Sequence, residues 1–401
     1  MSKAWSLVPL GQVVLPVERA EVPTSGKVYR QIGVRLWGAG AYEREAIDGA
    51  QTKYQTLSRV ETDDIIVNKI WARNGSVAVV SEALAGCYGS NEFPTFAPIR
   101  EKLAPRWFHW LTKTKNFWEQ CDEKSRGTSG KNRIRPERFL EIEIPLPPLP
   151  EQRRIVARIE ELAAKIEEAR GLRREAVEEI EALTQRTKAR LFDSDRWQKL
   201  PLGSLLREES RNGLSPRPSD MPPGIPILRI SAATSRSDDI VDESDIRYLR
   251  VSEKEAEQYK LEPGDLLACR FNGNLHYVGK FALYRGTLNE PRIYPDKLIR
   301  FRVDPEKTLP DFVRYAVNSP KGRSSVEAFC ATTAGNIGIS ASNLRTVPIP
   351  IPSLSEQRRI VTYLDNLHAK VDALKRLQTE TAAELNALLP SVLDKAFKGE
   401  L

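Results

Sequence analysis

Two stretches of the chain carry hydrophobic residues at alternating steps of four and three. In the first stretch the row consists of Ile155, Ile159, Leu162, Ile166, Ala169, Ala176, Ile180 and Leu183. In the second it consists of Ile360, Leu364, Leu367, Val371, Leu374, Leu385, Leu388 and Val392. The other positions are densely charged, as in Glu167, Glu168, Arg170, Arg174, Glu175, Glu178 and Glu179. A period of 3.5 residues keeps one narrow apolar stripe on one side of a helix, so the pattern predicts two helices of about 40 residues, each roughly 60 Å long and each packed on a partner helix.

Each expected helix follows a proline-rich block, at residues 144–150 and 349–354. Proline lacks a backbone donor and restricts the residue before it to extended geometry, so neither helix can begin before its block ends. Ser355 can cap the second helix, and Pro150 suits an early helical position in the first. Pro390 should kink or end the second helix near its last turns. Polar residues interrupt both apolar rows and can set the register, namely Arg173 in the first and Gln378 and Thr381 in the second.

The two stretches belong to an internal repeat. Residues 151–156, Glu-Gln-Arg-Arg-Ile-Val, recur identically as residues 356–361, at an offset of 205. The same offset relates the two proline blocks and the pairs Gly130 and Gly335, Ile134 and Ile339, and Phe192 and Phe397. Farther upstream, Trp5-x-x-x-Pro9-Leu10-Gly11 resembles Trp197-x-x-x-Pro201-Leu202-Gly203, and Asp64-Ile65-Ile66 resembles Asp265-Leu266-Leu267. The stretches between these anchors differ almost completely. Neutral drift after an old duplication would spread the changes evenly, so we expect the two copies to share a scaffold and to differ in the segments between the anchors.

Two matched apolar stripes in one chain favour pairing with each other. We expect a chain of the α+β or α/β class in which two globular domains are separated by two long helices packed as an antiparallel coiled coil, with a pseudo-twofold internal repeat. The globular domains are expected at residues 1–143 and 195–348. The proline-rich starts and their long helices are expected at residues 144–194 and 349–401. A homodimeric coiled coil is the alternative.

Composition narrows the class of protein without deciding it. The 401 residues carry a net charge of +7, a mild excess that permits a polyanionic partner. The four cysteines lack metal-ligand spacing, and we expect them to be reduced thiols in the cytoplasm. No apolar run is long enough to cross a membrane, and no signal peptide begins the sequence. Motifs for adenine methylation (Asn/Asp-Pro-Pro-aromatic), for a phosphate-binding loop and for a nucleophile elbow are not found, and no trustworthy nuclease motif is found either.

The duplicated block Ile-Pro-Leu-Pro-Pro-Leu-Pro-Glu-Gln-Arg-Arg-Ile-Val and the ending at residues 391–401 resemble the type I restriction-modification specificity subunit family. Segments 31–35, 90–94 and 263–267 share the resemblance, which covers essentially the whole chain. It implies a non-catalytic subunit with two target recognition domains, each reading one half of a split sequence in double-stranded DNA. It also implies that the helices set the gap between the halves and dock two modification subunits, which methylate adenine. Restriction subunits can join. The chain itself then needs no cofactor, because S-adenosylmethionine, ATP and Mg²⁺ belong to the partner subunits.

Candidate DNA-reading residues follow an apolar strand in each copy. Base reading needs side chains with paired donors and acceptors, and phosphate anchoring needs Lys or Arg. After Ile65-Ile66-Val67 we select Lys69, Arg73 and Asn74, and after Leu266-Leu267-Ala268 we select Arg270, Asn272 and Asn274. The alternative is that Trp71 and Phe271 belong to the core and the polar residues decorate a hairpin turn.

A second set of candidates lies just before each proline block. The basic segment 125–138 has a net charge of +4, since it holds five basic residues and one acidic residue, and it contributes Arg126, Lys131, Asn132 and Arg133. The matching loop of the second copy has no basic residue, so we expect neutral contacts from Thr333 and Asn336. Weaker candidates on neighbouring strands are Gln31, Arg35, Arg229 and Ser231. For the whole chain, a stand-alone DNA-modifying enzyme and a coiled-coil adaptor that binds protein are the alternatives.

Overall fold

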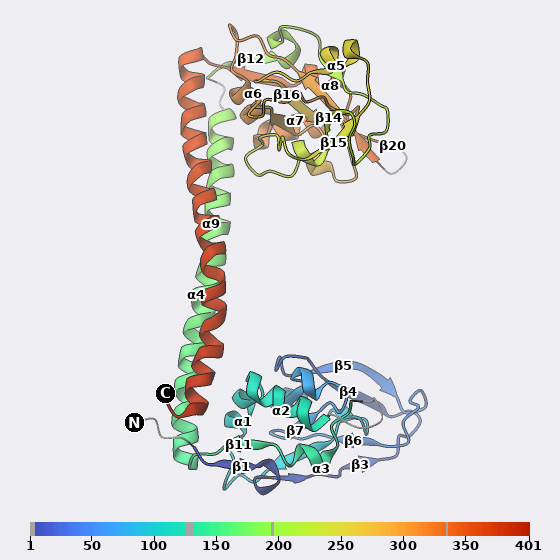
Figure 1. Cartoon of the computed structure of the whole chain (residues 1–401), viewed down its shortest axis with the longest axis vertical. Coiled ribbons are helices and arrows are strands. Elements are labelled where there is room, and N and C mark those ends of the chain that lie inside the picture. Colours follow the sequence, from blue (N-terminus) through green and yellow to red (C-terminus); the bar gives the residue numbers. More distant parts are fainter. Residues whose placement is uncertain (1–4, 126–131, 194–195, 334–335) are drawn as a thin grey trace. The chain divides into compact units, whose positions relative to one another are not determined.

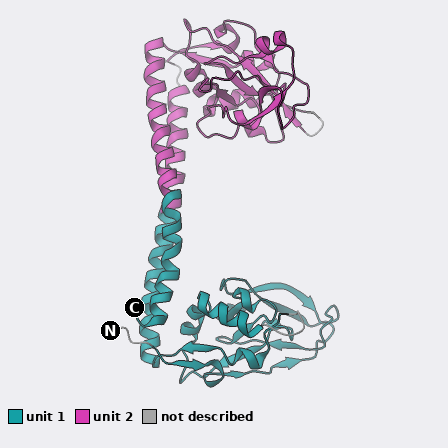
Figure 2. Ribbon diagram, in the orientation of Figure 1, with its two compact units in different colours: residues 1–172, 379–401 teal, residues 173–378 magenta. Residues whose placement is uncertain are grey.

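The computed structural model describes residues 5–125, 132–193, 196–333 and 336–401. Two compact units divide the chain (Figure 2): Met1–Leu172 with Thr379–Leu401 form unit 1, and Arg173–Gln378 form unit 2. Each unit therefore combines one globular domain with a part of both long helices. The helices are α4 (Leu149–Phe192) and α9 (Leu354–Lys398) (Figure 1).

The described residues of the globular part of unit 1 form three sheets and three helices. A two-stranded sheet joins β1 (Leu7–Pro9) and β11 (Glu143–Pro145). A four-stranded sheet has the order β2 (Val14–Pro16), β10 (Thr95–Pro98), β7 (Ile65–Val67), β8 (Val77–Val79). A five-stranded sheet has the order β3 (Ala20–Glu21), β6 (Leu57–Arg59), β9 (Tyr88–Gly89), β4 (Val28–Val34), β5 (Ala41–Asp48). The helices are α1 (Pro105–Leu111), α2 (Lys115–Ser125) and α3 (Pro136–Phe139), with 3-10 turns η1 (Leu10–Gln12), η2 (Ala72–Asn74) and η3 (Glu82–Leu84).

Unit 2 repeats part of this plan. A two-stranded sheet joins β12 (Gln198–Pro201) and β22 (Pro348–Ile351), and a four-stranded sheet has the order β13 (Arg211–Asn212), β19 (Leu298–Phe301), β16 (Leu266–Cys269), β18 (Phe281–Leu283). Two further sheets are β14 (Ile225–Leu228) with β15 (Ile246–Leu249), and β17 (Phe271–Asn272), β21 (Asn336–Gly338), β20 (Ala331–Thr333). The helices are α5 (Glu253–Tyr259), α6 (Pro310–Val317), α7 (Pro320–Glu327) and α8 (Ala341–Thr346), with 3-10 turns η4 (Leu202–Leu205), η5 (Ser231–Ala233) and η6 (Leu275–Tyr277).

The repeat found in the sequence is a repeat in space. In both four-stranded sheets the strands occur in the same chain order, and every pair in them is antiparallel. The copies differ in what is inserted into this sheet. Unit 1 has β3, β4, β5 and β6 between β2 and β7, with β9 of the same five-stranded sheet between β8 and β10, whereas unit 2 has β14 and β15 between β13 and β16. Among the described strands only β4 and β9 pair in parallel, so the chain is of the α+β class.

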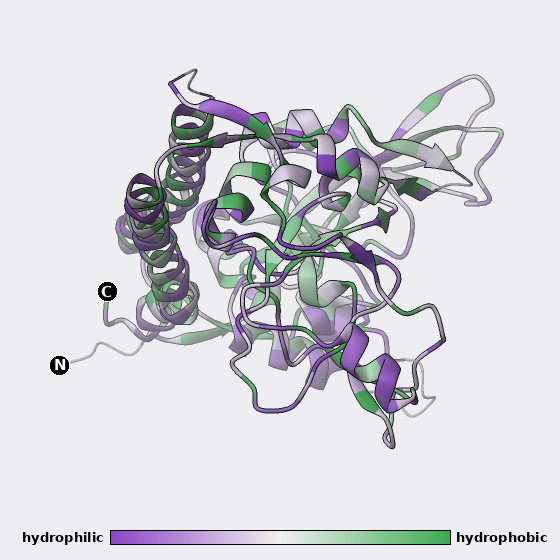
Figure 3. Cartoon of the chain, turned by 90° about the horizontal axis from the view of Figure 1, so that it is seen from above, coloured by the Kyte–Doolittle hydropathy of each residue, from purple (hydrophilic) through white to green (hydrophobic). Residues whose placement is uncertain are grey.

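The long helices pack through the expected apolar stripe, with one correction. Ile155, Ile159, Ile360 and Leu364 are buried, and the hydrophobic bands along both helices alternate with hydrophilic ones (Figure 3). Ala176, Leu183 and Leu388, which were expected in the stripe, are exposed. Beyond Arg173 the covered row runs instead through Val177, Ile180, Thr184 and Lys188. An unsupercoiled helix of 3.6 residues per turn drifts from a heptad repeat, and this shift of one position follows that drift.

Pro390 does not end the second helix, because α9 continues through it to Lys398.

Contacts between equivalent positions demonstrate the antiparallel pairing within each unit. Arg173 and Gln378 are 205 residues apart; each donates its side-chain N–H to the backbone carbonyl of the other. In unit 1 Arg170 donates to Asn386 Oδ1 at 3.1 Å. In unit 2 the residues at the same offset, Lys375 and Glu181, form an ion pair at 2.6 Å. The helices thus pair with each other within the chain, and the polar interruptions at Arg173 and Gln378 mark their register.

A buried glutamine anchors the start of each long helix. Gln152 donates to the carbonyls of Lys102 and Pro147, both at 2.8 Å, and accepts from the N–H of Ala104 at 2.9 Å. Gln357 has the equivalent partners 205 residues later: it donates to the carbonyls of Lys307 and Pro352 and accepts from the N–H of Leu309. It also accepts from the Thr308 hydroxyl at 3.1 Å, a bond that Leu103 at the equivalent position of unit 1 cannot make. Each glutamine therefore ties its proline block to the segment that precedes α1 or α6.

The other helix then closes each core. In unit 1 Phe397, near the end of α9, packs on Trp107 of α1 with ring centroids 4.6 Å apart. In unit 2 Phe192, at the end of α4, packs on Phe312 of α6 at 5.4 Å. These are the same two positions in the two copies, so the last turn of each long helix belongs to the core of the unit in which it ends.

Candidate nucleic-acid interface

The two sets of candidate residues meet through the same backbone contacts in both units. In unit 1 the N–H of Ile134 donates to the carbonyl of Lys69 at 2.9 Å, and the N–H of Lys69 donates to the carbonyl of Glu92 at 3.0 Å. In unit 2 the N–H of Ile339 donates to the carbonyl of Arg270 at 3.0 Å, and the N–H of Arg270 donates to the carbonyl of Lys297 at 2.8 Å. The segment that precedes the proline block is therefore held beside the segment that follows β7 or β16. We call the latter, residues 68–75 and 269–274, the reader segments.

A buried aspartate directly precedes each of the strands β7 and β16 and holds the backbone of the turn before the strand. Asp64 accepts from the N–H of Glu61 at 2.7 Å, and Asp265 accepts from the N–H of Glu262 at 2.8 Å. Asp64 also pairs with Arg19, and Asp265 pairs with Arg302. Burial raises the pKa of Asp265, while the bond to Arg302 opposes that shift. Each carboxylate thus closes the turn that starts β7 or β16.

In unit 1 the interface combines basic side chains with one acidic residue. Arg133 forms an ion pair with Glu92 at 3.1 Å, and this pair lies next to Lys69 through the backbone bonds described above. Arg73 and Asn74 lie on η2, and both side chains are half-buried. Asn132 is half-buried as well. The candidates Arg126 and Lys131 lie outside the described residues.

In unit 2 the candidates line a cavity of about 700 Å³. Pairing of β17 with β21 and of β21 with β20 forms one side of it. Arg270, Asn272 and Asn336, all selected from the sequence, lie in its wall. Asn274 lies beyond β17, and its side chain accepts from the N–H of His276 and caps η6. Thr333 is placed only by its backbone, opposite Asn336 in the β20–β21 hairpin.

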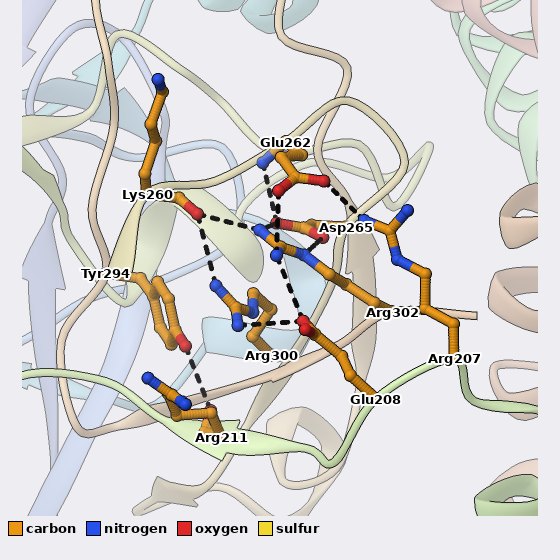
Figure 4. Close-up of polar contacts among 9 residues, drawn as sticks. All are labelled: Arg207, Glu208, Arg211, Lys260, Glu262, Asp265, Tyr294, Arg300 and Arg302. Atoms are coloured by element: carbon orange, nitrogen blue, oxygen red, sulfur yellow. Dashed lines mark hydrogen bonds and ion pairs between the residues drawn. The ribbon is translucent and has the colours of Figure 1, made fainter. Parts of the chain in front are cut away.

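Arg270 differs from most arginines of its unit in its electrostatic partners. Figure 4 shows the usual arrangement: Arg300 bonds Glu208 at 3.1 Å, and Arg302 bonds Asp265 at 2.7 Å. Arg270 forms no ion pair within the described parts of the chain. Its guanidinium lies 4.6 Å from the centre of the Phe271 ring, and its one polar contact is with the Asp296 carbonyl at 3.5 Å. The other N–H donors of this guanidinium, which has no carboxylate partner in the described residues, are available for a guanine edge or a phosphate.

The aromatic residues of the reader segments are not core residues. Trp71 is 45% exposed and Phe271 is 37% exposed, which excludes the alternative that both rings are buried. The other part of that alternative, polar side chains in a turn, holds for Asn68 and Asn272. Each side chain accepts the backbone N–H of the residue two positions later. Cys269, the first residue of the unit 2 reader segment, is buried, and burial raises the pKa of its thiol to about 11. The thiol is therefore protonated and is a poor nucleophile.

Comparison with known proteins gives this interface a context. The family model "Type I restriction modification DNA specificity domain" matches residues 3–178 and again residues 195–383. The chain belongs to this family. The EcoKI specificity subunit of Escherichia coli K12 is 33% identical over 308 residues, and the StySPI specificity subunit of Salmonella potsdam is 27% identical over 311 residues. The matches take in 73% and 75% of this chain but only 64% and 66% of the relatives, slightly less than two thirds of their length.

Solved structures of the family share the fold over nearly the whole chain. The HsdS subunit from Thermoanaerobacter tengcongensis has a TM-score of 0.68 at 26% sequence identity. The match covers 99% of this chain and 97% of the HsdS subunit. A second chain, from a study of complex assembly and conformational transition of the type I R-M system, has a TM-score of 0.73 at 25% identity, with 98% and 99% covered. In the described part of this family member, no helix is both long and apolar enough to cross a membrane.

The weaker candidates have partners that compete with DNA. Arg229 pairs with Asp220 at 3.1 Å and with Asp245 at 3.7 Å, and Ser231 donates to Asp245. Neither residue is on a strand, since Arg229 follows β14 and Ser231 begins η5. In unit 1 Gln31 of β4 donates to the carbonyl of Glu45 at 2.8 Å, while Arg35 lies over the Tyr42 ring.

Sequence reasoning missed several residues of the interface. Lys297, Phe329 and Asn343 line the unit 2 cavity. Lys297 stands at an offset of 205 from Glu92, so the repeat could have located it and would have shown that the charge at this position reverses between the copies. Phe329 and Asn343, which bonds the Phe329 carbonyl at 3.4 Å, carry no such signal.

Proposed function

We propose that this chain is the non-catalytic DNA-specificity subunit of a type I restriction-modification complex. Each unit reads one half of a bipartite target in double-stranded DNA. The observation that carries the proposal is the shared backbone frame: equivalent main-chain bonds place Lys69 in one unit and Arg270 in the other, while the side chains around them differ. One scaffold with two sets of readers suits two different half-sites.

The long helices set the gap between the half-sites and dock two modification subunits, and restriction subunits can join the assembly. The matched polar contacts of α4 and α9 support one defined register, which a spacing element needs. Adenine methylation with S-adenosylmethionine, and DNA translocation with ATP and Mg²⁺, take place on the partner subunits. The chain itself takes no cofactor and works in the cytoplasm.

The test begins with the modification subunit of the same system. Methylated adenines mapped in the source DNA identify the target. The assembled complex should then bind a duplex with that target more tightly than one with either half scrambled. Equal affinity for all three duplexes would contradict the proposal.

The alternatives make different predictions for the purified chain. A stand-alone enzyme would methylate DNA with S-adenosylmethionine or cut it with Mg²⁺ in the absence of partners. A protein-binding adaptor would show no DNA binding even within the assembled complex. We expect neither result.

A further inference from the structure

We propose that Trp37 of unit 1 is a DNA-contacting residue whose indole packs against the bases of the half-site read by that unit. The proposal rests on the proposed function and names a reader outside the sequence candidates. Three observations carry it: exposure, an unfavourable backbone conformation and attachment to the reader segment.

The Trp37 side chain is 59% exposed, more than any other aromatic side chain among the described residues. Tryptophan is the largest apolar residue, and leaving it in water loses the free energy that burial would give. The ring is partly supported by Trp118, with centroids 5.6 Å apart, and the Trp118 indole is itself held by a bond to the Thr112 carbonyl at 2.7 Å. Trp37 is therefore held on a rigid base with most of its surface free.

The backbone at Trp37 has a φ of 58°, in the left-handed region that favours glycine. For a bulky residue this conformation is a true outlier, and such outliers persist only where the surroundings impose them. Gly38 next to it also has a positive φ, so the turn already contains a residue suited to this geometry. A tryptophan in a position where glycine is easier points to a need for its side chain.

The surroundings that impose the turn belong to the reader segment. The N–H of Trp37 donates to the carbonyl of Asn74 at 2.6 Å, and the N–H of Gly38 donates to the carbonyl of Gly75 at 3.0 Å. The contact is close: a Cβ on Gly75 would lie 2.9 Å from the nitrogen of Gly38 and 2.7 Å from the Trp118 indole nitrogen. Any duplex that reaches Arg73 and Asn74 thus comes to the turn that carries Trp37.

Unit 2 supplies an independent parallel. Its reader segment contains one exposed aromatic side chain, Phe271, and a second, Phe329, is 41% exposed; both line the cavity that contains Arg270. The residues are not equivalent in the repeat, so each unit places aromatic surface beside its reader segment in its own way. DNA is the occupant that fits, because the neighbouring Lys69 and Arg73 are basic and flat apolar rings stack on or insert between bases.

The test uses the complex with its modification subunit and a duplex that carries the mapped target, with 2-aminopurine placed singly at positions across both halves. Trp37→Gly removes the ring and suits the backbone, whereas Trp37→Phe keeps a ring. Tyr54→Ala is the matched control, because Tyr54 is 44% exposed in the same unit without a bond to the reader segment. We expect Trp37→Gly to weaken target binding about tenfold or more, Trp37→Phe to weaken it less, and Tyr54→Ala to leave it unchanged.

The 2-aminopurine fluorescence should change in one half only, and Trp37→Gly should remove that change. Unchanged affinity and unchanged fluorescence for Trp37→Gly would overturn the proposal while leaving the DNA-specificity function intact. An equal loss in Tyr54→Ala, or a loss of hydrogen-exchange protection throughout unit 1 in Trp37→Gly, would overturn it as well. A wild-type complex that does not distinguish the target from a scrambled duplex would instead contradict the proposed function itself.

Discussion

Replacing Gln152 by alanine should destabilise unit 1 far more than the size of the side chain suggests. The glutamine is fully buried and makes three hydrogen bonds to the backbone of the proline block and of the segment before α1. Without it, one N–H and two carbonyls lose their partner, one of them in a buried place and two in partly buried places. Each unsatisfied group costs about 1–3 kcal/mol, and water that enters the vacated space recovers part of that. The net loss in the free energy of unfolding should be about 2–5 kcal/mol.

The repeat provides the control for this experiment. Gln357→Ala removes the three equivalent bonds from unit 2 together with the bond from the Thr308 hydroxyl, so hydrogen exchange should lose protection in unit 1 for the first variant and in unit 2 for the second. Arg158→Ala, on the exposed side of the same helix, removes an exposed ion pair with Glu161 and should change unfolding little. Denaturant unfolding of Gln152→Ala within about 0.5 kcal/mol of wild type would refute the reasoning, because it would mean that these bonds are replaced without cost.

Three further predictions concern reading, spacing and pH. Arg270→Ala should weaken target binding by about 1–3 kcal/mol and reduce sequence preference in one half of the target only. Arg229→Ala should change binding little, because Asp220 and Asp245 already hold that guanidinium. Equal losses of affinity for the two variants in a competition assay would contradict this reasoning. Gly171 and Arg376 are equivalent positions of the two helices, and seven residues inserted after each would add about 10.5 Å to each helix. The preferred gap between the half-sites should then grow by about three base pairs. A mapped target with an unchanged gap would exclude the spacing role. Burial lowers the pKa of His368 to about 4, and the positive charges of Lys188 and Arg314 lower it as well. Below about pH 6.5 the unfolded chain therefore binds a proton that the folded chain does not bind, so the stability of unit 2 should fall as the pH drops from about 6.5 to 4. His368→Gln should flatten that part of the plot of unfolding free energy against pH.

The parts of the fold that were predictable are those governed by period and by proline. The heptad rows and the blocks before them predicted both long helices and their pairing. The starts were slightly wrong, because α4 begins at Leu149 and α9 at Leu354, inside the blocks, and Ser353 rather than Ser355 accepts the N–H of Glu356 in the first turn of α9. The strict heptad failed toward the far end of each helix, because a helix of 3.6 residues per turn drifts from that repeat: beyond Arg173 of α4 Leu183 is exposed while Thr184 is covered, and in α9 Leu388 is exposed. The expectation that Pro390 could end the second helix was wrong, because α9 continues to Lys398 and its last turns pack on the unit 1 core.

The interface was predictable only in part, because it is assembled by contacts between distant segments. The reader segments were found, since each follows a strand shared by both copies. Their encounter with the segment before the proline block depends on the backbone bonds of Ile134 and Ile339, which no local pattern predicts. Trp37 was missed for the same reason, because its role depends on a turn that packs on the reader segment. Whether the named side chains touch bases stays a prediction.

The main-chain character of the shared contacts explains how one scaffold can serve two half-sites. The bonds that join residues 69, 92 and 134, and their counterparts at 270, 297 and 339, use only N–H and carbonyl groups. A change of side chain at these positions leaves the bonds in place, provided that the new residue is not proline. The frame therefore tolerates the exchange of Glu92 for Lys297, a reversal of charge beside the reader segment. A different half-site can then be read by other side chains without unfolding the unit that presents them, whereas the anchors at Gln152 and Gln357 are made by side chains and use the same residue in both copies.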